Sequence, residues 1–368
     1  MPTVGYLAEN YGGFEPGMLP TSRNIMHGSG MNVGNFAFWS AAHKLVGGRK
    51  ILVPFGAKAD DFKGKIDLLL IPAANWLNQR QDFGWLADLI EGLSIPVAIL
   101  GLGAQSDSDD DYPPLKEGTI RFLKAASNAT PFLAVRGKYT ERLCRHYGIE
   151  NVRPLGCPSI LLNEEAALGF DIENRWGKDV EKLVVHSLNI KPYSTAAEKL
   201  LLNWLTVNKG GGLVIQAPRE FVMLLVGEEF PEPSRQLLEQ TLRILDSDMS
   251  ANELKMLIQR FGYIPFSADA WIFHLGFFSH SVNTRIHGTV MSLMAGVPSI
   301  CCIHDTRTKE LCESLLIPSI EIKSSNQFET PEQLFDTVKF NGNDFNENRQ
   351  FLRKENIRLL REAGFPER

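Results

Sequence analysis

The feature that most constrains the fold of this chain is a repeated alternation of short β-rich runs with stretches of helical periodicity. Because parallel strands need a crossover connection, usually a helix, this alternation predicts parallel sheets covered by helices on both faces. The pattern is lost at 163–178, which predicts a domain boundary there. The expected strands are 50–54, 67–72, 96–100, 132–135 and 152–155 before the boundary, and 182–187, 213–216, 277–282 and 299–303 after it.

A chain of 368 residues is longer than one hydrophobic core usually supports, so two α/β domains are expected, at 1–170 and 171–345. A charged helix in the segment 346–368 is expected to pack back across the first domain. Ser250 and Glu253 have the spacing of a capping box and predict a helix that ends near 261. Pro331 predicts the start of another helix.

Composition excludes several classes of function. The net charge of −5 and the sequence pI of about 6.0 give no reason to expect nucleic acid or an anionic membrane surface as a partner. The sequence lacks both a signal-peptide pattern and an apolar stretch long enough to span a bilayer, so we predict a cytoplasmic protein. The five cysteines, with no Cys-x-x-Cys spacing, indicate reduced thiols, and Cys301 and Cys302 are expected to be buried. The acidic run at 107–111 is interpreted as a solvated loop, and no metal site is predicted.

The strongest candidate site lies after the strand expected at 277–282. Arg285 and His287 stand at the start of a short helix, where unpaired N–H groups and the helix dipole favour an anion. Arg285 matches carboxylate or phosphate oxygens, and an ion pair with an acidic neighbour is its alternative role. His287 is interpreted as functional rather than as a core residue, because Gly288 lets a ligand approach the backbone.

Ligands of parallel sheets bind beyond the carboxyl ends of the strands, so other residues at these positions are candidates too. Arg307 and Arg136 could reach the same anion, and solvent exposure is the alternative for each. His186 is either packed beside the sheet or an acid or base that faces the cleft. Three further polar residues complete the predicted substrate-binding set: Gln105, Gln216 and Arg219.

A glycine-rich segment at 28–35 precedes an expected helix that runs to Val46. Its spacing is not that of the dinucleotide fingerprint, no clear strand precedes it and no acidic ribose-binding residue follows it. NAD and FAD are therefore disfavoured, and no cofactor is predicted. Asn35 is either the cap of this helix or part of a backbone nest that faces a ligand.

Several of these residues resemble the signature of the polysaccharide pyruvyl transferase family. The resemblance rests on Thr284-Arg285-Ile286-His287, the helix to Pro298 and Asp305-Thr306-Arg307, with further matches at 32–35, 101–103 and 135–140. It implies two Rossmann-like domains in a GT-B-like arrangement, with the acceptor on the first domain and the donor on the second. It also implies transfer of a pyruvyl group from phosphoenolpyruvate, as co-substrate, to the hydroxyls of a carbohydrate acceptor, with Arg285 and His287 at the donor.

The sequence departs from the family pattern in several places, where Asn75, Asn35 and Cys157 stand in place of the usual residues. Two alternatives therefore stay open: a GT-B-type glycosyltransferase that uses a nucleotide sugar, and a non-catalytic protein that binds a glycan or an anion. The residues favour the transferase, because two arginines and a helix N-terminus suit both anionic groups of phosphoenolpyruvate.

Overall fold

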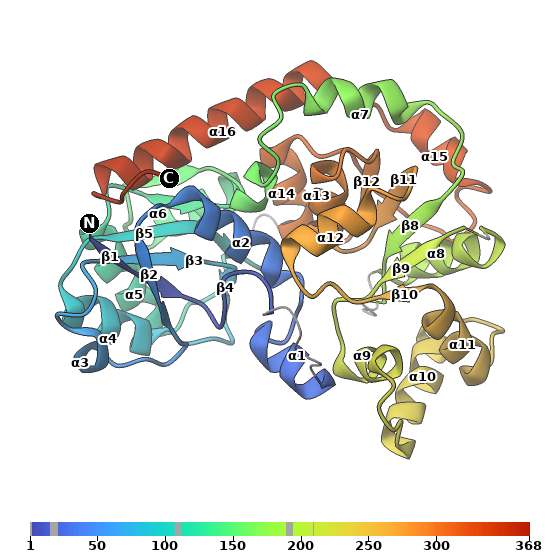
Figure 1. Cartoon of the computed structure of the whole chain (residues 1–368), viewed down its shortest axis with the longest axis horizontal. Helices are drawn as coiled ribbons and strands as arrows, with labels where there is room; N and C mark the ends of the chain where they lie inside the picture. The colour runs from blue at the N-terminus through green and yellow to red at the C-terminus, as the bar shows by residue number, and fades with distance from the viewer. Residues whose placement is uncertain (1, 15–20, 107–111, 189–193, 209) are drawn as a thin grey trace.

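The computed structural model describes residues 2–14, 21–106, 112–188, 194–208 and 210–368, so the acidic run at 107–111 lies outside the described residues. It contains two parallel β-sheets, which lie side by side with helices packed around them (Figure 1). The predicted class, two Rossmann-like domains with parallel sheets in a GT-B-like arrangement, is confirmed.

The first sheet has the strand order β2-β1-β3-β5-β6-β7, and β4 pairs with β5. Its strands are β1 (Thr3–Leu7), β2 (Arg49–Val53), β3 (Leu68–Pro72), β4 (Asn75–Leu77), β5 (Val97–Ala104), β6 (Leu133–Val135) and β7 (Val152–Pro154). Its helices are α1 (Ser22–Gly28), α2 (Asn35–Leu45), α3 (Ala59–Phe62), α4 (Gly84–Leu93), α5 (Glu117–Ala129), α6 (Lys138–His146) and the 3-10 helix η1 (Pro158–Leu161).

The second sheet has the strand order β10-β9-β8-β11-β12-β13. Its strands are β8 (Leu183–His186), β9 (Gly212–Val214), β10 (Gly262–Tyr263), β11 (His280–Asn283), β12 (Ser299–Ile303) and β13 (Ser319–Glu321). The remaining helices are α7 (Leu168–Trp176), α8 (Thr195–Val207), α9 (Arg219–Val226), α10 (Glu232–Ile244), α11 (Ala251–Phe261), α12 (Ala268–Leu275), α13 (Ile286–Met294), α14 (Thr306–Leu315), α15 (Pro331–Thr337) and α16 (Gly342–Glu362).

Every predicted strand is present, and β1, β4, β10 and β13 are additional strands that were not predicted. The strand expected from 277 begins only at His280, because Phe277 is exposed and ends the preceding turn. The capping box of Ser250 and Glu253 is formed at the start of α11, and α15 begins at Pro331, as predicted. Cys301 and Cys302 are buried in β12, and all five cysteines are free thiols.

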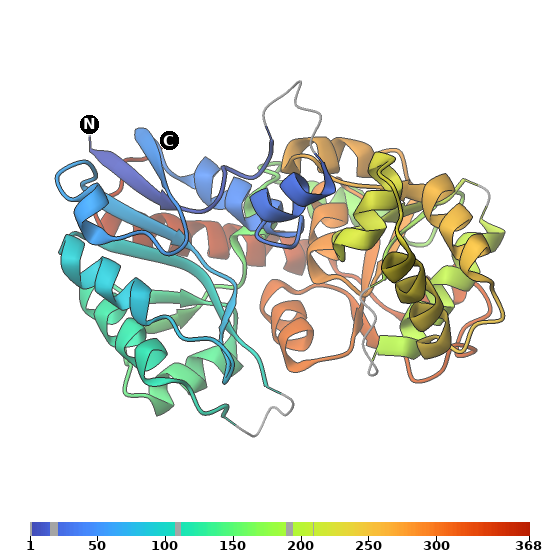
Figure 2. The ribbon, with the colours of Figure 1, turned by 90° about the horizontal axis from the view of Figure 1, so that it is seen from below.

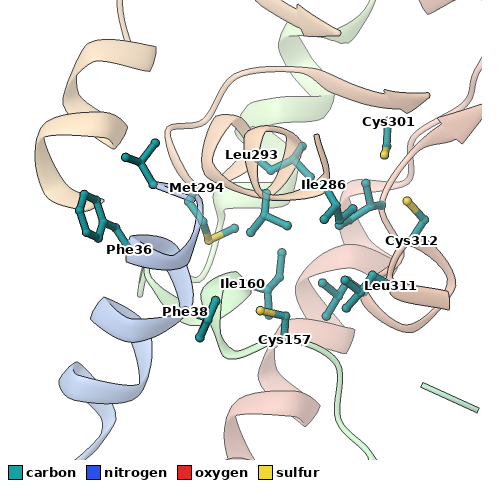
Figure 3. Close-up of a cluster of buried hydrophobic side chains, with 14 of the residues drawn as sticks. Phe36, Phe38, Cys157, Ile160, Ile286, Leu293, Met294, Cys301, Leu311 and Cys312 are labelled. Atoms are coloured by element: carbon teal, nitrogen blue, oxygen red, sulfur yellow. The ribbon is translucent and has the colours of Figure 1, made fainter. Parts of the chain in front are cut away.

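Both faces of the first sheet are buried, as its continuous apolar runs require. Leu68 and Leu70 of β3 point into one hydrophobic cluster, and Leu69 and Ile71 point into another. The first of these clusters continues into the second domain. Figure 3 shows part of it, where side chains of α2, η1, α13 and α14 meet, Phe38 and Cys157 among them. The two domains therefore share a hydrophobic core.

Helix α16 crosses from the second domain to the first, as predicted (Figures 1 and 2). Its Glu355 forms an ion pair of 2.7 Å with Arg153 of β7. Beyond the helix, the carbonyl of Pro366 accepts a hydrogen bond of 2.9 Å from the N–H of Gly47. These contacts attach the end of the described chain to the first domain.

Candidate active site

A cavity of about 500 Å³ lies between the two domains, beyond the carboxyl ends of their strands. Strands β8 and β11 are neighbours although helices and two strands separate them in sequence, so the loop after β11 opens at a topological switch point. The cavity is lined by Gly30, Met31, Asn32, Asn35, Phe38, Trp39, Phe55, Pro72, Ala74, Asn75, Trp76, Gln81, Phe83, Arg136, Gln216, Arg285, Ile286, His287 and Arg307.

Arg285 stands between β11 and α13 as the N-cap residue of the helix, and its side chain does not cap it. Ile286 and His287 of the first turn of α13 line the cavity, and no side chain among the described residues accepts from the first N–H groups of the helix. The carboxylate of Glu198, whose charge acts on the pKa of Arg285, accepts hydrogen bonds from Ser187, Leu188 and Thr284. Among the described residues, Arg285 forms no ion pair, so the alternative role that the sequence left open is wrong.

Arg136 enters the same cavity from the first domain, directly after β6. Its Nε donates to the carbonyl of Gly101 at 3.0 Å, and its Nη1 donates to Oδ1 of Asn75. Gly103 makes room for this side chain, because a Cβ at that position would lie 2.5 Å from Cδ of Arg136. The guanidinium is thus held in place at 3% exposure.

Arg307 comes from the first turn of α14, and its Nη2 lies 3.2 Å from Oδ2 of Asp305. Asp305 also caps α14 by accepting from the N–H of Thr308 at 2.7 Å. The ion pair therefore orients the arginine while the carboxylate remains part of the helix cap. Gln216, which follows β9, is buried at 2% exposure and lines the same cavity.

We call Arg136, Arg285, Arg307 and Gln216 the cationic cluster. Each carries a buried donor atom with no hydrogen-bond acceptor among the described residues: Nη2 of Arg136, Nε of Arg285, Nε of Arg307 and Nε2 of Gln216. Burial, with the charge of Arg307, lowers the pKa of Arg285 to about 10, so the group is still protonated at neutral pH. Buried donors normally have partners, so this convergence indicates a site for an anion with several oxygen atoms.

His287 faces the same cavity at 8% exposure. Its Nε2 lies 3.7 Å from Sγ of Cys157, which accepts a hydrogen bond of 3.1 Å from the hydroxyl of Ser159. Burial and the charges of Arg136 and Arg307 lower the pKa of His287 to about 3. The imidazole is therefore neutral at pH 7 and is able to accept a proton from a bound ligand.

Aromatic side chains of the first domain line another part of the cavity. Trp76 stacks on Phe83 with ring centroids 5.0 Å apart, and Phe55 contacts Trp76 edge to face at 6.1 Å. Phe55 is 38% exposed, whereas the other two rings are largely buried. We call these three residues the aromatic cluster. Flat apolar rings of this kind suit the C–H face of a sugar ring.

The structure places His186 and Gly288 outside the cavity. His186 is fully buried, with Nδ1 2.6 Å from Oδ1 of Asn283, and its Nε2 accepts from the indole N–H of Trp271 at 3.1 Å. A Cβ on Gly288 would lie 2.3 Å from Cγ of His186, so this glycine lets α13 pack on the histidine. The prediction of a substrate-binding role is corrected for both residues, because neither reaches the cavity.

Three other residues that were predicted to bind substrate lie in three different places: Asn35, Gln105 and Arg219. Asn35 lines the cavity, but the N-cap of α2 is Gly34, and Nδ2 of Asn35 instead donates to the carbonyl of Ser29 at 2.9 Å. Gln105 lies in an adjoining cavity. Arg219 is exposed and donates to the hydroxyl of Ser22 at 3.0 Å, between α9 and α1. A substrate contact from Arg219 is therefore not supported by its position.

Glu310 belongs to this region and was not among the residues predicted from the sequence. It is 4% exposed and accepts hydrogen bonds from the N–H and the hydroxyl of Thr140, at 2.6 and 2.9 Å. These bonds join α14 of the second domain to the N-terminus of α6 in the first. Arg307 lies on α14 and Arg136 lies two residues before α6, so these bonds hold together the two segments that carry the arginines. The spacing of three residues between Glu310 and Arg307 was the one available signal.

The described residues contain no helix that is both long and apolar enough to cross a membrane. They also contain no group of three or more His, Cys, Asp or Glu side chains that could hold a metal ion. The residues that line the cavity offer cationic, amide, imidazole and aromatic groups to a ligand.

Comparisons with known proteins give one family and a set of distant structures. The family model for polysaccharide pyruvyl transferase matches residues 31–306, which is more than half of the chain. No curated protein sequence matches the chain.

The similar structures include UDP-N-acetylglucosamine 2-epimerase from Rickettsia bellii, with 12% identity, a TM-score of 0.44 and coverage of 98% of this chain and 96% of that one. The epimerase from Methanocaldococcus jannaschii has 10% identity, a TM-score of 0.44 and coverage of 96% and 99%. Anabaena HepE in complex with UDP and glucose has 10% identity, a TM-score of 0.43 and coverage of 98% and 95%.

Proposed function

The chain belongs to the polysaccharide pyruvyl transferase family, and from this premise we propose that it transfers a pyruvyl group from phosphoenolpyruvate to two hydroxyls of a sugar, as a cyclic ketal. The observation that carries the proposal is the set of four buried donors in the cationic cluster that have no acceptor within the described part of the chain. Phosphoenolpyruvate offers a carboxylate and a phosphate, whose oxygens supply acceptors for these donors. The N-terminus of α13 adds N–H groups for the same anion.

The proposed reaction balances without a further cofactor. One sugar hydroxyl attacks the carbon that carries the phosphate, and its proton ends on the methylene carbon, which becomes a methyl group. The second hydroxyl then attacks the same carbon as the C–O bond to phosphate breaks, and its proton leaves with the phosphate. The products are the pyruvyl ketal and hydrogen phosphate. The arginines would stabilise the negative charge that collects on the departing phosphate.

His287 is the proposed proton carrier. Its imidazole is neutral in the free protein, because burial and nearby arginines lower its pKa. It can therefore take the proton of a sugar hydroxyl as a general base. A bound trianion would offset the charge of the arginines and raise the pKa of the imidazole, so that the imidazolium is able to pass the proton on. Cys157 and Ser159 hold the ring from the side of Nε2.

Calorimetric titration tests the donor assignment. We expect phosphoenolpyruvate to bind the wild-type protein more tightly than UDP-glucose, and Arg285→Ala to weaken its binding about 10- to 100-fold, since hydrogen bonds to charged groups contribute about 1.5–3 kcal/mol each. Arg235→Ala is the matched control, because Arg235 is exposed on α10. Preferential binding of UDP-glucose would support a glycosyltransferase instead. Binding of phosphoenolpyruvate without phosphate release in the presence of sugar acceptors would support a non-catalytic protein.

A further inference from the structure

A second cavity, of about 470 Å³, adjoins the cavity that contains the cationic cluster. Asn75 and Gln81 line both cavities, so a ligand that fills the first can extend into the second without leaving the protein surface. The second cavity is bounded by the end of β5 and by the segment that follows β4. Close by, the hydroxyl of Thr306 donates to the carbonyl of Ser106 at 2.9 Å, so α14 contacts the same edge.

The side chains of the second cavity are mainly amides. Asn75, Gln81 and Gln105 line it, and the amide of Gln105 has no hydrogen-bond partner among the described residues. The amide of Asn78 is used internally, since its Oδ1 accepts from the N–H of Arg80 and of Gln81. Its Nδ2 donates to Oε1 of Gln81 at 3.1 Å, so Asn78 shapes the turn. With Oδ1 of Asn75 held by Arg136, the side chain of Gln105 is an amide of the cavity that remains wholly available to a ligand among the described residues.

The chemistry of this cavity suits a neutral ligand rich in hydroxyls. An amide offers both donors and an acceptor, and a hydroxyl is also both donor and acceptor. Among the described lining residues, Arg80 is the one group that is charged at neutral pH, and it is exposed at the rim. The cationic cluster has the opposite character. A ligand that spans the two cavities would thus carry its anionic group at Arg136 and its hydroxyls at Gln105.

Asn75 lies where the two cavities meet. Its Oδ1 accepts from Nη1 of Arg136 in the first cavity, while its side chain also borders the second. Building on the proposed function, we propose that the amide-lined cavity is a second saccharide subsite. It binds the sugar next to the one that receives the pyruvyl group, and the preferred acceptor is therefore at least a disaccharide.

The test measures binding of matched sugar pairs with inorganic phosphate in the first cavity, so that no reaction occurs. The probes are methyl β-glucoside with methyl β-cellobioside, methyl β-galactoside with methyl β-lactoside, and methyl α-mannoside with methyl α-mannobioside. Titrations followed by NMR compare the wild type with Gln105→Ala and with the control Gln350→Ala, which changes an exposed glutamine of α16. Phosphoenolpyruvate is titrated separately into each protein.

We expect at least one disaccharide to bind about tenfold more tightly than its monosaccharide, as one or two added hydrogen bonds would give. Gln105→Ala should remove this preference and leave the affinities for the monosaccharide and for phosphoenolpyruvate within about twofold, while Gln350→Ala keeps the preference. Equal binding within every pair, or a preference that survives Gln105→Ala, overturns the subsite. Failure of phosphoenolpyruvate to bind the wild type would overturn the proposed donor alone, since the sugar preference is measured without it.

Discussion

The cationic cluster and the aromatic cluster line one cavity, but the protein supports them in different ways. The rings of Trp76 and Phe83 stack on each other, so the aromatic cluster is satisfied without a ligand. The arginines repel one another, and each retains a buried donor with no acceptor among the described residues. The aromatic cluster is therefore stable without a ligand, whereas the buried donors of the cationic cluster find acceptors only when an anion is bound.

The largest expected effect separates chemistry from binding. His287→Ala should lower kcat for pyruvyl transfer about 10²- to 10⁴-fold, because it removes the proposed base, and should leave the affinity for phosphoenolpyruvate within a few-fold. Phosphate release and calorimetry measure the two quantities. The control is His27→Ala, at an exposed position on α1. A variant that keeps turnover within a few-fold would show that the proton moves by another route.

A smaller effect is expected from the cationic cluster alone. Arg307→Ala should weaken binding of phosphoenolpyruvate about 10- to 50-fold, since the remaining arginines still hold the anion. Binding of a sugar acceptor should change little. Calorimetric titration with each ligand measures the difference. Equal losses for the two ligands would contradict the division of the cavity into two chemical regions.

The aromatic cluster should show the reverse pattern. Phe55→Ala is expected to raise KM for the sugar acceptor about three- to tenfold, because an aromatic contact contributes about 0.5–1.5 kcal/mol. The KM for phosphoenolpyruvate should not change. Phe273→Ala is the matched control, since Phe273 is 73% exposed on α12 and does not line the cavity. An increase in the KM for phosphoenolpyruvate would contradict the assignment of this cluster to the acceptor.

The smallest expected effect is a change in pKa on ligand binding that distinguishes His287 from His186. In the free protein the pKa values of both histidines are lowered to about 3, chiefly by burial. The unfolded chain binds more protons than the folded one between pH 6.5 and 3, so both residues make the free energy of unfolding fall as the solution is acidified through that range. Phosphoenolpyruvate should raise the pKa of His287 alone, since His186 is held by Asn283 and Trp271. NMR titration of the ring protons measures both values, and an equal rise would argue against an anion beside His287.

The cationic cluster was largely predictable from the sequence, whereas the aromatic cluster was not. Arg136, Gln216, Arg285 and Arg307 all follow strands or begin helices, so a rule about strand ends selects them. Phe55 also follows a strand and Trp76 lies within the short strand β4, but an apolar residue at either position is interpreted as part of the core. Glu310 and Cys157 act through partners that are distant in sequence, and a single sequence carries no record of those contacts.

The errors among the predicted residues have a common physical origin. Position after a strand says that a side chain lies near the edge of the sheet, but it does not say which way the side chain points. His186 follows that rule and points into the core, where Asn283 and Trp271 occupy both ring nitrogens. Gly288 was expected to admit a ligand, and it admits that histidine instead. The fold was easier to predict, because hydrophobic periodicity repeats over many residues.

The unpartnered donors of the cationic cluster also bear on how this sequence is maintained. Replacing such a guanidinium by an apolar side chain of similar size would relieve a buried, repelling charge and would tend to stabilise the empty protein. Random substitution followed by screening for heat resistance alone should therefore replace these arginines early. Their presence implies that selection acts on the liganded protein, and laboratory evolution toward thermostability should keep the anion in the medium.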